Sequence, residues 1–156
     1  MNNGRELKSR EGTTQGDNLA MSFYALSTSV MINSLHFSLS SEAVPQVKQV
    51  WLADDGTGAG KVSALKSWWD LLLVEGGKIG FHVNAGKSWL IAKNDAVFNE
   101  ASELFNGTSI NITLDGQRHL GAVLGSNQFR SQYTTDLVST WCREMERLSE
   151  LAESQP

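Results

Sequence analysis

The stretch Val50-Trp51-Leu52-Ala53-Asp54-Asp55 places two adjacent carboxylates directly after a run of apolar residues. With Val47 just before it, this run has the composition of a short strand, and the Asp-Asp-Gly that closes it has the composition of a turn. We therefore expect a strand that holds Asp54 and Asp55 at a fixed position. The glycine-rich segment that follows, Gly56–Gly60, is expected to be flexible.

Two carboxylates at such a turn can bind hard divalent cations. Mg²⁺ prefers carboxylate oxygens, and two such ions about 3.5–4 Å apart can stabilise both the attacking and the leaving oxygen of a phosphoryl transfer. Most adjacent aspartates nevertheless lie in solvated turns, so Asp54 and Asp55 alone do not identify a metal site. A site for two ions also needs at least one further carboxylate from another part of the chain.

Outward from this turn, apolar periodicity predicts four helices. They cover Leu19–Leu35, with Asp17 or Asn18 as the cap and a broad buried face; Val62 to about Glu75, ended by Gly76-Gly77; Asp95–Phe105, capped by Asn94 or Asp95; and Tyr133–Leu151. Further strands are expected at Ser88–Ala92 and at Ile110–Leu114 and His119–Leu124, the last two joined by a turn at Asp115-Gly116. The order of helices and strands predicts an α+β or mixed α/β domain, and we take α+β as the expected class.

Composition limits the functions that the chain can have. Its 156 residues suffice for one domain with a hydrophobic core but not for a complete polymerase. The net charge of −4 argues against a dedicated nucleic-acid-binding domain, which usually carries a surplus of Lys and Arg. Cys142 is the only cysteine, and no run approaches the ~20 apolar residues of a membrane span. We expect an intracellular protein, in the cytoplasm or nucleus, without disulfides or a membrane anchor.

Four segments together resemble the palm of reverse transcriptases, in particular those of eukaryotic retrotransposons. Residues 50–55 resemble the Tyr-x-Asp-Asp hairpin, with Leu52 where the aromatic usually stands. Residues 10–20 (REGTTQGDNLA) resemble the Gln-Gly loop and the helix after it, with Asn18 in place of the expected proline. Residues 80–88 (GFHVNAGKS) resemble the segment whose lysine faces the triphosphate, and residues 119–125 (HLGAVLG) resemble the primer-grip hairpin. The four occur in the family's order across residues 9–125.

The resemblance implies a catalytic role for three residues. Asp54 would be the main ligand of Mg²⁺ or Mn²⁺, and Asp55 a second, weaker one. Lys87 would lie near the pyrophosphate leaving group as a charge partner or proton donor. From the residues alone, Lys87 is equally well interpreted as a surface lysine before a strand.

The resemblance also implies contacts with nucleic acid. Gln15 and Gly16 would lie against the nascent base pair, Gly16 because the backbone must approach closely there. His119, Leu120 and Gly121 would hold the primer end, although a plain edge hairpin explains them equally well. The partners of the intact parent would then be an RNA or DNA template with its primer and deoxynucleoside triphosphates.

The resemblance divides the chain into three parts. Residues 1–12 are interpreted as a loose N-terminal end, residues 13–125 as a partial palm with helices on one face of an antiparallel sheet, and residues 126–156 as the start of a thumb helix. The family places a further catalytic aspartate on a strand upstream of the Gln-Gly loop. Neither Glu6 nor Glu11 has an apolar strand to hold it in that role. We therefore expect the chain to be inactive by itself.

Two other interpretations remain open. The chain can be a non-catalytic remnant of a retroelement that acts as a protein-interaction domain or has no function. It can also be a small acidic interaction domain unrelated to polymerases. The tryptophans are interpreted as core residues rather than base-stacking platforms, because they lie on apolar faces: Trp51, Trp68, Trp69, Trp89 and Trp141.

Overall fold

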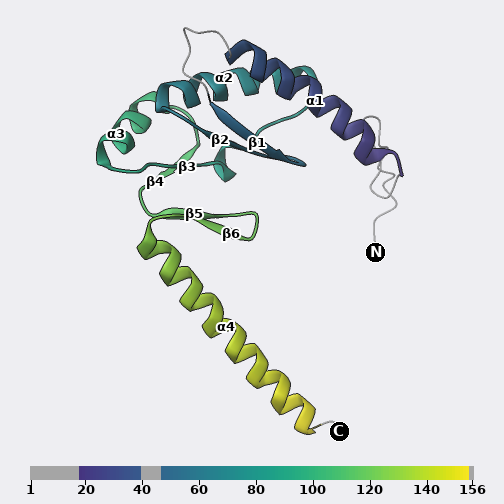
Figure 1. Ribbon diagram of the computed structural model, residues 1–156, viewed down its shortest axis with the longest axis vertical. Coiled ribbons are helices and arrows are strands. Elements are labelled where there is room, and N and C mark those ends of the chain that lie inside the picture. Colours follow the sequence, from purple (N-terminus) through teal and green to yellow (C-terminus); the bar gives the residue numbers. More distant parts are fainter. Residues whose placement is uncertain (1–17, 40–46, 155–156) are drawn as a thin grey trace, which may run out of the picture. The chain divides into compact units, whose positions relative to one another are not determined.

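A computed structural model describes residues 18–39 and 47–154 (Figure 1). These residues form helices that alternate along the chain with short strands. Contacts divide the chain into two compact units, residues 1–83 and 84–156. The mixture of helix and strand confirms the expected α+β composition. The described strands do not form one antiparallel sheet, however: they form three two-stranded sheets, of which one is parallel.

The first unit contains two helices and a β-hairpin: α1 (Ala20–Leu39), β1 (Lys48–Leu52), β2 (Asp55–Ala59) and α2 (Val62–Lys78). Its core lies where Met31 and Leu35 of α1 meet Trp68 and Leu72 of α2. Figure 1 shows the hairpin beside these two helices, and Trp51 of β1 packs against their core. The unit is thus held together by apolar contact between segments that lie more than 30 residues apart.

Helix α1 buries a narrow stripe, not the broad face expected. Thr28, Met31 and Leu35 are buried, whereas Leu26 and Val30 are exposed. Residues three and four positions apart share one side of a helix, so a single partner helix covers one such row. Within the described residues α2 is the helix that contacts α1, and Ile32 also packs against their shared core.

Helix α2 runs through Gly76-Gly77, where we expected it to end, and finishes at Lys78. Its true end is formed by Gly80, which adopts the left-handed region with φ of 74°. The Phe81 N–H donates to the Gly76 carbonyl at 2.9 Å, and the Gly80 N–H donates to the Gly77 carbonyl at 3.4 Å. This is the hydrogen-bond pattern of a Schellman motif, in which the glycine beyond the last turn ends the helix.

The hairpin pairs β1 with β2 in antiparallel register, from Lys48 opposite Ala59 to Leu52 opposite Asp55. The segment expected to be flexible is therefore a strand. Gly56 lies against the Trp51 indole so closely that an added Cβ would be 2.7 Å from ring atoms. Glycine allows the strand to pass under this ring, which explains a composition that suggested a loop.

The second unit contains η1 (Ala85–Lys87), β3 (Trp89–Ile91), α3 (Asp95–Leu104), β4 (Asn111–Thr113), β5 (Gly116–His119), β6 (Ala122–Gly125) and α4 (Asn127–Ser154). Strands β3 and β4 are parallel and are connected through α3. The Asn94 side chain accepts a hydrogen bond from the Val97 N–H at 3.0 Å and caps α3, as expected. The predicted strand at Ser88–Ala92 is also confirmed, as β3.

The predicted turn at Asp115-Gly116 is wrong. Strand β4, which precedes it, pairs with β3, and the hairpin is instead formed by β5 and β6 around Leu120-Gly121. Both turn residues have positive φ, 50° and 79°, as in the two-residue turns whose twist matches that of paired strands. From composition, Asp115-Gly116 indicated a turn more strongly than Leu120-Gly121. Leucine rarely adopts the positive φ that Leu120 has in the actual turn.

Helix α4 begins at Asn127, earlier than the predicted Tyr133, because Ser126 caps it: the Ser126 hydroxyl accepts from the Phe129 N–H at 3.1 Å. None of its residues is buried. Trp141 is 55% exposed and Trp89 is 45% exposed, so the core interpretation is wrong for these two tryptophans. It is confirmed for Trp68 and Trp69. No helix in the described ranges is long and apolar enough to span a membrane.

Candidate functional site

The carboxylates of Asp54 and Asp55 lie at the tip of the β1–β2 hairpin. Leu52 and Asp55 are the last paired residues, and the turn between them is formed by Ala53 and Asp54. Both aspartates are exposed. Two adjacent carboxylates that are open to solvent on a short turn can offer oxygen ligands to a hard cation.

The turn carries backbone strain. Ala53 has φ of 53°, in the left-handed region, where an L-residue with a Cβ costs about 1–2 kcal/mol relative to the right-handed one. Such strain persists only where the surrounding structure fixes it, and strained residues cluster at functional sites. The strain at Ala53 is consistent with a turn shaped for the position of its aspartates.

A polar contact joins the strand that leads into this turn to helix α2. The Gln49 side-chain oxygen accepts from the indole N–H of Trp51 at 3.1 Å and from that of Trp68 at 3.0 Å. The Trp51 ring also packs on the rings of Trp68 and Phe81, with centroids 6.2 Å and 6.1 Å apart. One glutamine thus joins the strand before the aspartates to helix α2.

The sequence pattern did not reveal the role of Gln49. The apolar residues that indicated the strand, Val50 and Leu52, face outward and are 70% and 60% exposed, while Gln49 and Trp51 face the core. Alternation places residues 49 and 51 on one face of the strand, and the indoles at 51 and 68 both need an acceptor when they are buried. The signal in the sequence was Gln49, a polar residue two positions before Trp51 and therefore on the same face of the strand.

Tyr24, in the second turn of α1, lies close enough to the hairpin tip to be affected by its charge. Partial burial raises the pKa of the Tyr24 phenol above its usual value, and the negative charges of Asp54 and Asp55 raise that pKa further. The hydroxyl oxygen of Tyr24 is buried and finds no hydrogen-bond partner among the described residues. Sequence reasoning counted Tyr24 only as part of an apolar face.

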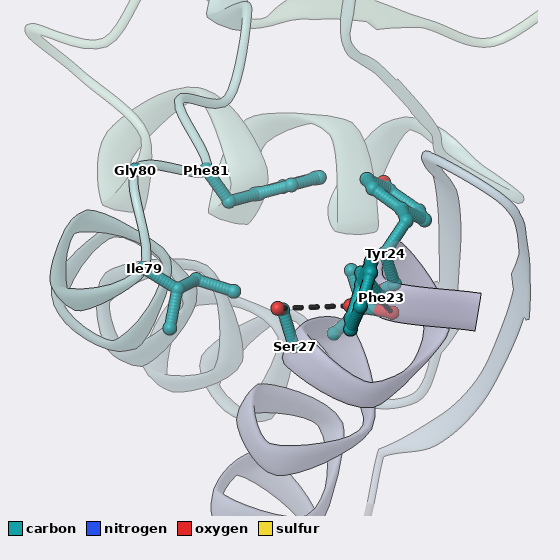
Figure 2. A pocket seen from close by; sticks show the side chains of 7 residues that line it. Phe23, Tyr24, Ser27, Ile79, Gly80 and Phe81 are labelled. Atoms are coloured by element: carbon teal, nitrogen blue, oxygen red, sulfur yellow. Dashed lines mark hydrogen bonds between the residues drawn. The ribbon is translucent and has the colours of Figure 1, made fainter. Parts of the chain in front are cut away.

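A pocket of about 290 Å³ lies beside Tyr24, between α1 and the segment that follows α2 (Figure 2). It has no charged residue in its lining, which consists of Phe23, Tyr24, Ser27, Thr28, Ile79, Gly80 and Phe81. The Ser27 hydroxyl donates to the Phe23 carbonyl at 3.0 Å and the Thr28 hydroxyl to the Tyr24 carbonyl at 2.8 Å. These two hydroxyl protons are therefore already used within the helix.

The other predicted site residues that the structure describes lie in the second unit. Lys87 is the last residue of η1, and its side chain is exposed. The loop around it is held by two contacts: the Asn84 side chain accepts from the Lys87 N–H at 3.2 Å, and the Asn111 amide donates to the Gly86 carbonyl at 2.8 Å. The backbone around Lys87 is thus fixed, while its side chain is open to solvent.

His119, Leu120 and Gly121 lie at the end of the β5–β6 hairpin. His119 is the last residue of β5 and pairs with Ala122, and Leu120 and Gly121 form the turn. Leu120 is half exposed. The three residues form a single turn, which is compatible with a gripping role and with a plain hairpin alike.

Gln15 and Gly16 lie outside the described residues, as do Glu6 and Glu11. Among residues 18–39 and 47–154, no three or more His, Cys, Asp or Glu side chains gather into a group that could hold a metal ion. In these ranges no third such side chain joins Asp54 and Asp55.

No family model, no curated protein and no solved structure matches this chain.

Proposed function

We propose that this chain is the part of a reverse transcriptase palm that carries the Asp-Asp turn, and that its intact parent transfers deoxynucleotides to a primer 3′ end. One observation carries the proposal. Asp54 and Asp55 lie at a hairpin tip, within electrostatic reach of Tyr24 near the start of α1. The family resemblance requires this arrangement, and an aspartate pair directed elsewhere would have excluded it.

In this proposal Asp54 and Asp55 bind Mg²⁺ or Mn²⁺, with Asp54 the stronger ligand. A bound cation would stabilise the charge that develops on the oxygens during nucleotidyl transfer. The contact of Gln49 with Trp51 and Trp68 holds the strand that leads into the turn against helix α2.

The remaining roles follow the resemblance. Lys87 neutralises charge on the pyrophosphate leaving group. Leu120 and its neighbours His119 and Gly121 support the primer end. Gln15 and Gly16 contact the nascent base pair. Leu52, exposed at the end of β1, provides the apolar contact beside the primer terminus that an aromatic residue makes in the family.

The proposal includes inactivity of the chain by itself. Two carboxylates balance only part of the charge of two divalent ions, and the described residues bring no third carboxylate to the turn. We expect a single cation to bind weakly and primer extension to be undetectable.

The first test measures Mn²⁺ binding by the loss of the free-ion electron paramagnetic resonance signal. The wild-type chain should bind one ion weakly and saturably, and Asp54→Asn should abolish the binding. Asp115→Asn is the matched control, because Asp115 is also an exposed aspartate beside a glycine and a hairpin. Equal binding by the wild type and Asp54→Asn would remove the metal site from the proposal.

The second test measures primer extension on a poly-rA template with an oligo-dT primer. The isolated chain should give no product. The chain extended by the sequence encoded directly upstream should gain activity if that sequence supplies a strand ending in Asp, and Asp54→Asn should abolish it. An unrelated upstream sequence would favour the non-catalytic remnant, and robust extension by the isolated chain would contradict its inactivity.

A second candidate function, a protein-interaction domain, is favoured by helix α4. Apolar residues three and four positions apart form one exposed row along this helix: Val138, Trp141, Met145 and Leu148. Exposed rows of this kind often mark interaction sites. If this row binds a partner in place of nucleic acid, Trp141→Ser should abolish an association that Asp54→Asn leaves intact.

A further inference from the structure

Helix α4 carries an apolar row that no other described residue covers. The row consists of Val138, Trp141, Met145 and Leu148, and each of them is between 46% and 66% exposed. None of the 28 residues of α4 is buried, and its main contacts are with β6, the strand that leads into it. Helices in proteins gain most of their stability by packing an apolar face, so α4 is incomplete without a partner.

The spacing of the α4 row indicates that this partner is another helix. Successive members of the row are three, four and three positions apart. This is the spacing of the a and d residues that form the seam between two helices in a coiled coil. Thr134 and Ala152 continue the spacing at either end, and the positions between Val138 and Leu148 are otherwise polar apart from Cys142. An apolar face this narrow fits one helix.

The charge of α4 argues against an anionic partner. Residues 127–154 contain three arginines, one aspartate and four glutamates, a net charge of −2. Helices that lie on membranes, and surfaces that bind nucleic acid, instead carry a surplus of Lys and Arg. The partner that the row fits is therefore a protein helix.

The row is complementary to a second copy of itself. Its spacing reads the same in both directions from Arg143, so an antiparallel copy places an apolar residue opposite every member. Val138 then lies opposite Leu148 of the second copy, and Trp141 lies opposite Met145. A two-fold axis makes each of these contacts occur twice, which is the commonest arrangement of protein dimers.

Charge selects the antiparallel direction. Residues 127–140 contain one arginine and one aspartate, whereas residues 141–154 contain two arginines and four glutamates. A parallel pair would place the two acidic halves side by side, but an antiparallel pair places each of them beside a neutral half. The acidic half also comes near the positive N-terminal end of the partner's helix dipole, and α4 has no basic residue of its own in its last turn.

The attachment of α4 to its unit favours the same direction. The β5–β6 hairpin precedes the first turn of α4 (Figure 1). In a parallel pair two such hairpins would meet at one end of the helices. In an antiparallel pair centred on Arg143 they lie at opposite ends, and the apolar rows can approach without a clash between them.

We infer that the chain forms a dimer through α4, in which the rows of two copies pack antiparallel about Arg143. The inference names the partner for the second candidate function, an interaction domain, and it does not depend on the proposed role of Asp54 and Asp55. The seam from Thr134 to Ala152 is about 27 Å long. A single helix pair of this length is a small interface, and small interfaces give weak association that is reversed by dilution.

The first test is sedimentation equilibrium of the full chain over a wide range of concentrations. The average mass should rise from that of one chain toward that of two. Trp141→Ser should raise the dissociation constant at least about tenfold, because a buried tryptophan at the centre of an interface carries much of the binding energy and each dimer loses two. Arg143→Ser is the matched control: it places the same residue on the opposite side of the helix and should leave the dissociation constant within about threefold.

The second test measures the direction of the helices by the distance between two nitroxide labels, one on each copy. Cys142 is exposed, so Cys142→Ser first removes the other reactive thiol, and Gln132→Cys then provides the labelling site on the polar side of α4. In the antiparallel dimer the two labels are separated by about 33 Å along the helix axis. In a parallel dimer they lie at the same level, with only the ~8–10 Å between helix axes and the length of the labels separating them.

Three results would overturn the inference: a chain that stays monomeric at all concentrations, a dimer that Trp141→Ser leaves unchanged, and a short label distance. Asp54→Asn separates this inference from the polymerase proposal. It should remove Mn²⁺ binding and leave dimerisation unchanged, whereas Trp141→Ser should do the reverse. Either proposal can therefore fail while the other holds.

Discussion

Gly76 and Gly77 are adjacent in helix α2, yet the structure predicts opposite effects when each is replaced by alanine. A Cβ at Gly76 would lie 2.7 Å from the Phe81 carbonyl oxygen and 3.3 Å from a carbon of the Phe81 ring. A Cβ at Gly77 would meet nothing within 4 Å. The pair thus separates the helix propensity of alanine from the packing of the segment that follows the helix.

The expected magnitudes follow from these distances. Alanine is favoured over glycine inside a helix by about 0.5–1 kcal/mol, so Gly77→Ala should stabilise the first unit by that amount. At Gly76 the same gain is offset by a contact about 0.6 Å shorter than the ~3.3 Å of normal carbon–oxygen contacts. The obstacle is backbone, so either the Schellman hydrogen bonds or the helix end must shift, at a cost of about 1–3 kcal/mol. Gly76→Ala should therefore be the less stable variant by about 2 kcal/mol.

Urea unfolding followed by tryptophan fluorescence measures this difference. Trp51, Trp68 and Trp69 belong to the first unit, and replacing the exposed Trp89 and Trp141 by phenylalanine makes the signal specific for that unit. Isolating one unit matters, because two units need not unfold in a single transition. If Gly76→Ala proved as stable as Gly77→Ala, the packing of the Phe81 backbone on α2 would be refuted.

Three further predictions concern the core, the hairpin turn of the second unit and the titration of the site. Leu35→Ala should destabilise the first unit by about 3–5 kcal/mol, because Leu35 is fully buried between two helices, and urea unfolding should show it. Leu120→Asn should stabilise the β5–β6 turn by about 1 kcal/mol, because asparagine tolerates positive φ better than leucine, and a thermal melt checks this. In a Tyr133→Phe background, ultraviolet absorbance of the ionised phenol should show that Asp54→Asn lowers the pKa of Tyr24, since one of the charges that raise it is removed. The raised folded-state pKa of Tyr24 also makes stability depend on pH. The stability that the neutral phenol contributes should be complete below the pKa of an unfolded tyrosine and should be lost as pH rises through the folded-state pKa. Urea unfolding at a series of alkaline pH values measures this loss.

The candidate site was only partly readable from the sequence. The turn at Asp54 followed from the composition of residues 50–56, because strand and turn signals act over a few neighbouring residues. The sequence pattern counted Tyr24 only as part of an apolar helix face and did not indicate that the charges of Asp54 and Asp55 act on it. Gln49 was missed because its role depends on Trp68, which lies 19 residues further along the chain.

Local sequence patterns were enough to locate the helices and to show how several of them begin. Asn94 caps α3 through a hydrogen bond to a residue three positions away, so its role can be recognised in a short stretch of sequence. The apolar spacing of α2 lies on one face of one helix and can be recognised in the same way. Tertiary structure decided which strands pair, which glycines lie inside a helix, and which apolar residues are buried. Strand β4 pairs with β3 rather than with the next strand, and the helical Gly76 leaves room for the Phe81 carbonyl that folds back on it. These outcomes depend on contacts between residues that are distant in sequence, and local patterns carry no information about such contacts until the chain has folded.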